Sequence, residues 1–88
     1  MKKLNKAQAN QIANIWNTLH AGVTEETKTI ALVVENSIKG YDVEVHNVGE
    51  KNRKTAFYHL ESLVNICATF NCSNYIRYWD GEVYAVIY

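Results

Sequence analysis

The chain has 88 residues, of which 48% are hydrophobic and 20% charged, and nine Lys and Arg balance nine Asp and Glu. This composition excludes a disordered or fibrous chain and predicts one globular domain over residues 1–88. A formal net charge of zero gives no overall attraction to nucleic acid or to an anionic membrane.

The apolar runs and the cysteines favour a cytoplasmic chain. The longest apolar run, residues 83–88, is far shorter than the roughly 20 residues that span a bilayer, so we expect no membrane segment. Polar residues between Asn5 and Gln11 stand where a signal peptide needs its apolar stretch, so the mature chain is expected to begin near residue 1. Two cysteines, Cys67 and Cys72, are too few for a secreted disulfide scaffold.

The first predicted element is a helix over residues 6–20. Asn5 and Gln8 have the spacing of a capping box, and Gly22 follows the expected end of the helix. The expected buried stripe has helical spacing and consists of Ile12, Ile15, Trp16 and Leu19.

The segment over residues 24–40 has two interpretations. Thr24 as N-cap, acidic residues in the first turn, and Lys39 and Gly40 at the end favour a helix, which is the preferred prediction. The apolar run over residues 30–34 is rich in β-branched side chains and equally fits a buried strand. In that alternative, residues 29–35 form a hairpin with residues 41–47.

The middle of the chain predicts a strand, a loop and a helix. Residues 41–48 alternate between apolar and polar side chains, as in a half-buried strand. A charged loop over residues 49–54 precedes a helix over about residues 55–71. The expected buried stripe of that helix is Ala56, Leu60, Leu63, Val64, Cys67 and Phe70.

The last segment predicts a hairpin with a two-residue turn at Asp80 and Gly81, which tolerate the positive φ angles of such turns. The turn fixes the register, so that Trp79 opposes Glu82 and Arg77 opposes Tyr84. One face is expected to join the core and consists of Ile76, Tyr78, Val83, Ala85 and Ile87.

The predicted fold class is therefore α+β. The preferred order is α-α-β-α-β-β, with a three-stranded antiparallel sheet packed on helices. If residues 24–40 contain a strand, the order becomes α-β-β-α-β-β, with a four-stranded antiparallel sheet.

The other face of this sheet carries the main functional prediction. Exposed aromatic side chains on one sheet surface are typical of interfaces, so we expect a partner protein to bind there, with Trp79 and Tyr84 as anchors. The alternative is that the same face is covered within the chain or by a second copy, giving a homodimer through the sheet face. The residues of the predicted binding face are Asp42, Glu44, His46, Tyr75, Arg77, Trp79, Glu82, Tyr84 and Tyr88.

The basic residues suggest a second, weaker hypothesis. They flank the starts of the two helices predicted at residues 6 and 55, where an anion or an acidic partner would gain from the helix dipole. Nucleic acid is disfavoured on the sheet face, because its acidic residues outnumber Arg77. The candidate anion-binding residues are Lys2, Lys3, Lys6, Lys51, Arg53 and Lys54.

An enzyme is not predicted. Asp42, Glu44 and His46 share a strand face and could hold a metal or a proton, but no second cluster completes a ligand set. Cys67 and Cys72 lack metal-binding spacing, and phosphate-loop and nucleophile motifs are missing. His20 and His59 are expected at a helix end and partly exposed on a helix, without a catalytic role. We therefore expect no catalytic residue, no metal and no cofactor.

No stretch of the sequence matches a family motif. In its small size, its lack of catalytic signatures and its AT-rich residue usage, the chain resembles the small proteins that phages and other mobile elements encode to bind and block host machinery. This resemblance implies a non-enzymatic inhibitor of a host protein.

Overall fold

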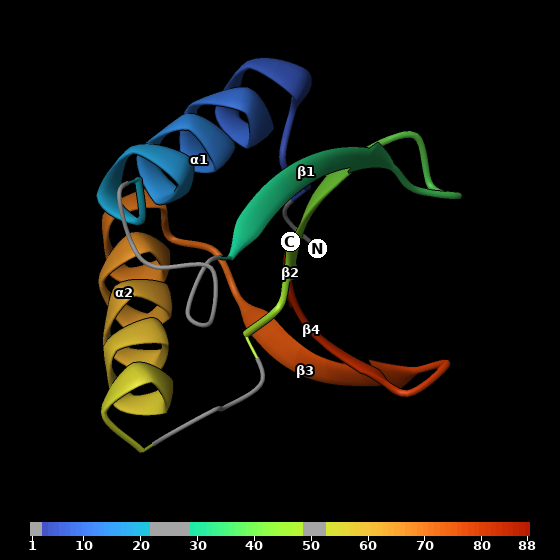
Figure 1. Ribbon diagram of the computed structural model, residues 1–88. Coiled ribbons are helices and arrows are strands. Elements are labelled where there is room, and N and C mark those ends of the chain that lie inside the picture. The colour runs from blue at the N-terminus through green and yellow to red at the C-terminus, as the bar shows by residue number, and fades with distance from the viewer. Residues whose placement is uncertain (1–2, 22–28, 49–52) are drawn as a thin grey trace.

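The computed structural model describes residues 3–21, 29–48 and 53–88, and leaves the side chains of residues 53–56 and of Trp79 outside the description. The strands form one antiparallel sheet in the order β1-β2-β4-β3. Both helices lie on one side of this sheet (Figure 1). In chain order the elements are α1 (Lys6–Leu19), β1 (Ile30–Glu35), β2 (Tyr41–His46), α2 (Arg53–Phe70), β3 (Asn74–Trp79) and β4 (Glu82–Ile87).

The α+β class is confirmed, with the element order of the alternative prediction and four strands. The preferred helix over residues 24–40 is wrong, because residues 30–35 form β1 and pair with β2 from Ile30↔His46 to Glu35↔Tyr41. Its expected N-cap, Thr24, lies outside the described residues. The β-branched run in this segment is better accommodated in a strand, which leaves its side chains room on both sides of the sheet.

The turn between β1 and β2 is built around Asn36. Its side-chain oxygen accepts from the backbone N–H groups of Ile38 at 3.1 Å and Gly40 at 2.9 Å. Lys39 has a φ of 61°, the left-handed conformation that closes the turn. The Lys39 and Gly40 pair that suggested a helix end therefore belongs to the hairpin turn, where Lys39 takes the left-handed conformation and the Gly40 N–H donates to Asn36.

The predicted ends of the two long helices agree with the structure to within about two residues, as is usual for helix ends. The capping box is confirmed: Gln8 N–H donates to Asn5 Oδ1 at 2.8 Å, and Asn5 N–H donates to Gln8 Oε1 at 3.0 Å. The hairpin turn is confirmed as well, with φ of 50° at Asp80 and 78° at Gly81. The predicted pairing of Trp79 with Glu82 follows from this turn.

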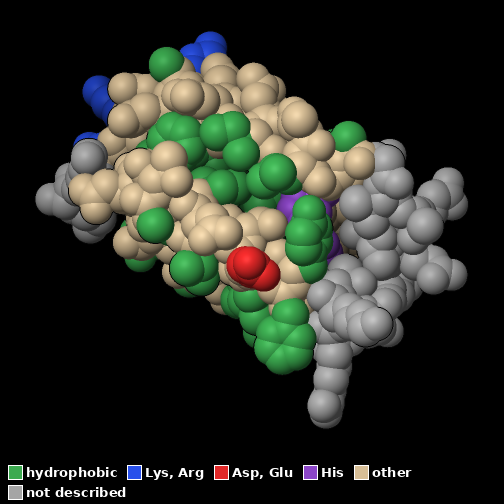
Figure 2. Space-filling model, turned by 90° about the vertical axis from the view of Figure 1, so that its left-hand side faces the viewer, with side chains coloured by type: hydrophobic (Ala, Val, Ile, Leu, Met, Phe, Trp, Pro, Cys, Tyr) green, Lys and Arg blue, Asp and Glu red, His purple; other side chains and the backbone are tan. Residues whose placement is uncertain are grey.

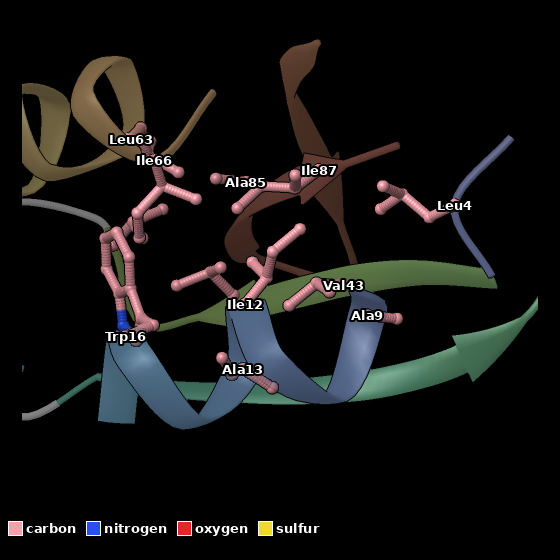
Figure 3. Close-up of a cluster of buried hydrophobic side chains, with 13 residues drawn as sticks. Leu4, Ala9, Ile12, Ala13, Trp16, Val43, Leu63, Ile66, Ala85 and Ile87 are labelled. Carbon is pink, nitrogen blue, oxygen red and sulfur yellow. The ribbon is translucent and has the colours of Figure 1, made fainter. Parts of the chain in front are cut away.

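The core lies between α1, α2 and the near face of the central strands (Figure 3). Trp16 and Ile12 of α1 point toward the sheet, where Val43, Ala85 and Ile87 meet them. These side chains are almost completely removed from water, which gives the main apolar contribution to stability. Leu63 and Ile66 of α2 close the cluster at the Trp16 end.

The element order repeats an α-β-β unit, and the sheet order sets β2 beside β4 in the centre with β1 and β3 at the edges. The two units are not equally packed. α1 lies close along β1 and β2, whereas α2 approaches α1 and lies farther from β3 and β4. On the helix side, α2 meets the start of β3, where Asn74 Nδ2 donates to Cys67 Sγ at 3.3 Å, and the described contacts do not extend along the rest of the strand.

This arrangement corrects three predicted faces. Ile76 and Tyr78 were expected in the core, but they are 40% and 77% exposed, because the described part of α2 reaches β3 at Asn74 and does not cover these two residues. Val86 was expected on the open face and is only 2% exposed. In α2 the buried stripe is rotated, so that Leu60 and Val64 are exposed. The residues buried in their place include Ser62, Ile66 and His59, the last of which was expected to be partly exposed.

No helix in the described part of the chain is long and apolar enough to cross a membrane.

Candidate protein-interaction face

The surface of the sheet that points away from both helices is called here the outer face. Because side chains alternate along a strand, the register assembles this face in rows. The first row runs Ile30, His46, Tyr84, Arg77 across the four strands. The second row runs Leu32, Glu44, Val86, Tyr75. Val34 and Asp42 begin a third row.

The strand β1 supplies outer-face residues that the sequence analysis missed. Ile30, Leu32 and Val34 are 36–46% exposed and form an apolar border along one edge of the face. They were missed because the segment was assigned to a helix, where their alternation has no meaning. The β-branched run over residues 30–34 was the signal that could have found them.

The predicted trio of Asp42, Glu44 and His46 does share the outer face, as a polar stripe along β2. All three side chains are half-buried. Glu44 Oε1 lies 3.3 Å from His46 Nε2, and Asp42 Oδ1 accepts a hydrogen bond from Asn36 Nδ2 at 2.9 Å. The stripe is thus held in place by its neighbours before any ligand arrives.

Tyr84 lies in the middle of the face and packs its ring on His46, with ring centroids 4.3 Å apart. Loss of hydration raises the pKa of the Tyr84 phenol above its ordinary value, and the Glu82 and Glu44 carboxylates add to the shift. The phenol therefore stays protonated at neutral pH, and its single O–H donor is engaged by the Glu82 carboxylate.

The remaining predicted residues lie along the β3 side of the face. Tyr75 and Tyr88 are exposed, with ring centroids 5.7 Å apart in an edge-to-face contact. Arg77 and Glu82 are exposed as well. The backbone of Trp79 pairs with Glu82, but its predicted role as an anchor falls on a side chain outside the described residues.

Val86 forms the floor of the outer face. It lies between Glu44 on one neighbouring strand and Tyr75 on the other, and both of these side chains are longer. Both helices lie on the other side of the sheet, so Val86 is buried by the longer side chains of Glu44 and Tyr75 on either side of it. The face is therefore a surface with a buried aliphatic centre and taller aromatic and polar sides.

A hollow of about 210 Å³ lies at one end of the outer face. Asp42, Tyr75 and Tyr88 of the face contribute to its wall, and Ile38 and Tyr41 add apolar surface. A hollow of this size accepts a single large apolar side chain, which is how many interface anchors are bound. It joins the outer face to the turn between β1 and β2.

The charges of the outer face favour a cationic partner over an anionic one. Asp42, Glu44 and Glu82 contribute carboxylates, against the guanidinium of Arg77. A phosphate backbone would meet net repulsion there.

The predicted anion site is only partly within the described residues. Lys3 Nζ donates to the Ile38 carbonyl at 2.7 Å, which ties this ammonium group to the turn after β1. Lys6 is exposed in the first turn of α1. Lys2 and Lys51, and the side chains of Arg53 and Lys54, lie outside the described residues.

A cluster of rings lies where α1 ends beside α2. His20, the C-cap of α1, stacks on Trp16 with centroids 4.3 Å apart and meets His59 at 5.1 Å. Both ring nitrogens of His20 are buried and have no hydrogen-bond partner among the described residues. Burial, and then His59, lowers the pKa of His20 to about 4, so the ring is neutral at physiological pH. The arrangement is that of a structural core.

The other candidate ligands do not form a metal centre within the described residues. No group of three or more His, Cys, Asp or Glu side chains there could hold an ion. Cys67 and Cys72 are free and half-buried. Burial raises the pKa of Cys72 to about 12, and its contact with Cys67 adds to the effect. A thiol with so high a pKa is a poor nucleophile.

A groove of about 330 Å³ runs between α1 and α2 on the helix side, where apolar side chains gather in a hollow (Figure 2). Ile15, Leu19 and Phe70 form part of its lining, and Glu61 is the only charged residue among the described side chains that line it. Polar side chains line it as well, but the Tyr58 and Thr69 hydroxyls donate to the carbonyls of Leu19 and Asn65.

No protein-family model, no curated protein and no solved structure matches this chain.

Proposed function

We propose that this chain is a non-enzymatic protein-binding module that docks its partner on the outer face of the sheet. The observation that carries the proposal is the exposure of apolar side chains along both borders of one face. Patches of this kind on small proteins are characteristic of interaction sites. The exposed apolar residues are Ile30, Leu32 and Val34 on one border and Tyr75 and Tyr88 on the other.

The chemistry of the face defines the class of partner. The acidic stripe of Asp42 and Glu44 lies between the two apolar borders and is already oriented by Asn36 and His46. A complementary surface carries apolar side chains with Lys or Arg between them, and its charges would speed and orient docking. Inhibition of a host protein by a cytoplasmic phage or mobile-element product belongs to this proposal, because occupying a basic surface would block its other ligands.

The test compares two substitutions of exposed aliphatic residues to lysine. Leu32→Lys places a cation within the outer face. Val64→Lys places a cation on the exposed side of α2, away from the outer face, and is the control. Each protein is immobilised and exposed to lysate of the native host, and bound proteins are identified by mass spectrometry. We expect a partner that the wild type and Val64→Lys retain and that Leu32→Lys loses.

The captured protein is then purified and its affinity measured as salt increases. Attraction to Asp42 and Glu44 predicts a dissociation constant that rises with ionic strength. If Leu32→Lys retains the partner as well as the wild type does, the outer face is not the binding surface.

The second candidate function, binding of nucleic acid or an acidic partner through the two basic clusters, is favoured by the exposure of Lys6 at the start of α1. Lys3, by contrast, is engaged with the Ile38 carbonyl. A titration with labelled DNA and RNA at low salt tests this function. No binding, or binding indifferent to salt, would eliminate it.

A further inference from the structure

The strand β3 has an open edge. Ser73 and Tyr88 exchange both backbone hydrogen bonds, at 3.0 Å each, so the odd-numbered residues of β3 bond to β4. The N–H and C=O groups of Asn74, Ile76 and Tyr78 consequently point away from the sheet. No strand in the described part of the chain pairs with them. An edge of this kind is a template for another strand.

The other edge strand, β1, has a side chain bound to its edge, whereas β3 does not have this protection among the described residues. On β1 the side chain of Asn17 donates to the Ala31 carbonyl at 3.1 Å and accepts from the Ala31 N–H at 2.8 Å. Proteins commonly protect edges with proline, bulges or inward-pointing charges. β3 has no proline, and its one charged residue, Arg77, lies on the outer face.

An apolar surface accompanies the open edge on the helix side of the sheet. Ile76 and Tyr78 face that side and are exposed, since the described part of α2 contacts β3 at Asn74 and does not cover these two side chains. α2 itself exposes Phe57, Leu60 and Val64, at helical spacing. A single partner could cover both the open edge of β3 and the apolar side chains on the helix side. It would add a strand to β3 and place apolar surface against Ile76, Tyr78 and α2.

We propose that this partner is a second copy of the chain, paired through β3 in antiparallel register centred on Ile76. This register alone matches all three outward-facing residues, since Asn74 opposes the partner's Tyr78 and Ile76 opposes the partner's Ile76. On the outer face it sets Tyr75 beside the partner's Arg77, where a guanidinium can pack on a ring.

The neighbouring registers are less favourable. A shift of two residues in one direction sets Arg77 opposite the partner's Arg77, and like charges in opposed positions destabilise a strand pair. A shift of two residues in the other direction sets Tyr78 beyond the start of the partner's β3, so that it has no strand residue opposite it. The positions of Tyr75 and Arg77 in β3 thus favour the register centred on Ile76 when two copies of this strand pair.

The resulting dimer has one continuous sheet with the four helices of its two copies on the same side. Its inner surface at the junction is formed by Ile76 and Tyr78 of each copy, flanked by the exposed stripes of the two α2 helices. The outer faces of the two copies become one extended surface. The dimer therefore leaves Leu32 and the acidic stripe free to bind a partner.

The test uses opposite charges at one exposed position. Tyr75→Glu and Tyr75→Lys both remove the contact with Tyr88, but only the first attracts the partner's Arg77. Sedimentation equilibrium at low ionic strength measures the dimer dissociation constant of each. We expect the wild type to dimerise, and the Lys variant to dissociate roughly tenfold more readily than the Glu variant, because the pair occurs twice. Added salt should reduce this difference.

Two further variants make the outcome decisive. Ile76→Lys sets two cations against each other at the centre and should leave a folded monomer, since Ile76 is already 40% exposed in one copy. Leu32→Lys, on β1, should leave the dimer intact even where it abolishes partner binding. A wild type that stays monomeric, equal dissociation of the two Tyr75 variants, or dissociation by Leu32→Lys would overturn the proposal.

Discussion

Asn17 binds both backbone groups of Ala31 through its side-chain amide, donating to the carbonyl at 3.1 Å and accepting from the N–H at 2.8 Å. The amide thus takes the place of a neighbouring strand at the edge of β1. It also fixes α1 against the sheet, because the same contact joins the C-terminal half of the helix to the strand.

Asn17→Leu should destabilise the protein by about 1–3 kcal/mol, because it leaves two polar groups of the nearly buried Ala31 without partners. Urea unfolding followed by circular dichroism measures this change. Asn14→Leu, at an exposed position of the same helix, is the matched control and should change stability by only a few tenths of a kcal/mol. Equal effects of both substitutions would show that the amide contact contributes little.

Gly81→Ala should cost roughly 1 kcal/mol through backbone strain alone. Gly81 has a φ of 78°, and a Cβ built there meets no atom within 4 Å, so steric contact with neighbours is absent. Gly81→Asn should cost less, because Asn tolerates the left-handed conformation. Thermal unfolding of the three proteins ranks them, and an Asn variant less stable than the Ala variant would contradict the explanation.

Stability should fall in mild acid because of His20. Its pKa is lowered from 6.5 to about 4 in the folded state, so the unfolded chain takes up a proton first. The stabilisation from the neutral ring is complete above pH 6.5 and is lost as the pH falls toward 4. We expect a loss of about 2 kcal/mol in the free energy of unfolding between neutral pH and about pH 4.5.

His20→Phe should remove that part of the pH dependence while keeping a ring against Trp16. Urea titrations of both proteins at the two pH values give the comparison. The acid loss of the wild type should exceed that of the variant, and parallel losses would assign the effect to other groups, His59 among them.

Cys72 should react slowly with iodoacetamide in the folded protein. Burial first, and then Cys67, raises its pKa to about 12, so the thiolate is scarce at mildly alkaline pH. We expect alkylation at least ~100-fold slower than in the urea-unfolded chain. Peptide mapping by mass spectrometry separates Cys72 from Cys67. A folded rate near the unfolded rate would show that the thiol is accessible and ionised.

Local signals in the sequence were sufficient for much of the fold. The capping box at Asn5 and Gln8 and the turn at Asp80 and Gly81 are decided by neighbours within a few residues. The register of the last hairpin follows from that turn, and with it the position of Tyr75 and Tyr84 on one face. The alternation over residues 41–46 likewise set Asp42, Glu44 and His46 together on that face.

Other features depended on contacts that are distant in sequence. Residues 30–35 form a strand because β2 is available to pair with them, and short apolar runs carry no information on such pairing. The exposure of Ile76 and the burial of Val86 depend on where α2 lies and on the side chains of neighbouring strands. No pattern within β3 or β4 records the position of a helix.

The sequence by itself thus determined the class of the fold, its helix ends, its final turn and the polar stripe on β2. Only the tertiary structure decided that Ile30, Leu32 and Val34 border the outer face, that Asn17 protects one edge of the sheet, and that β3 is left open. Hydrogen bonding and side-chain alternation act over a few residues and can be seen in a linear pattern. Burial depends on which surfaces meet in space, and that is settled only when the whole chain has packed.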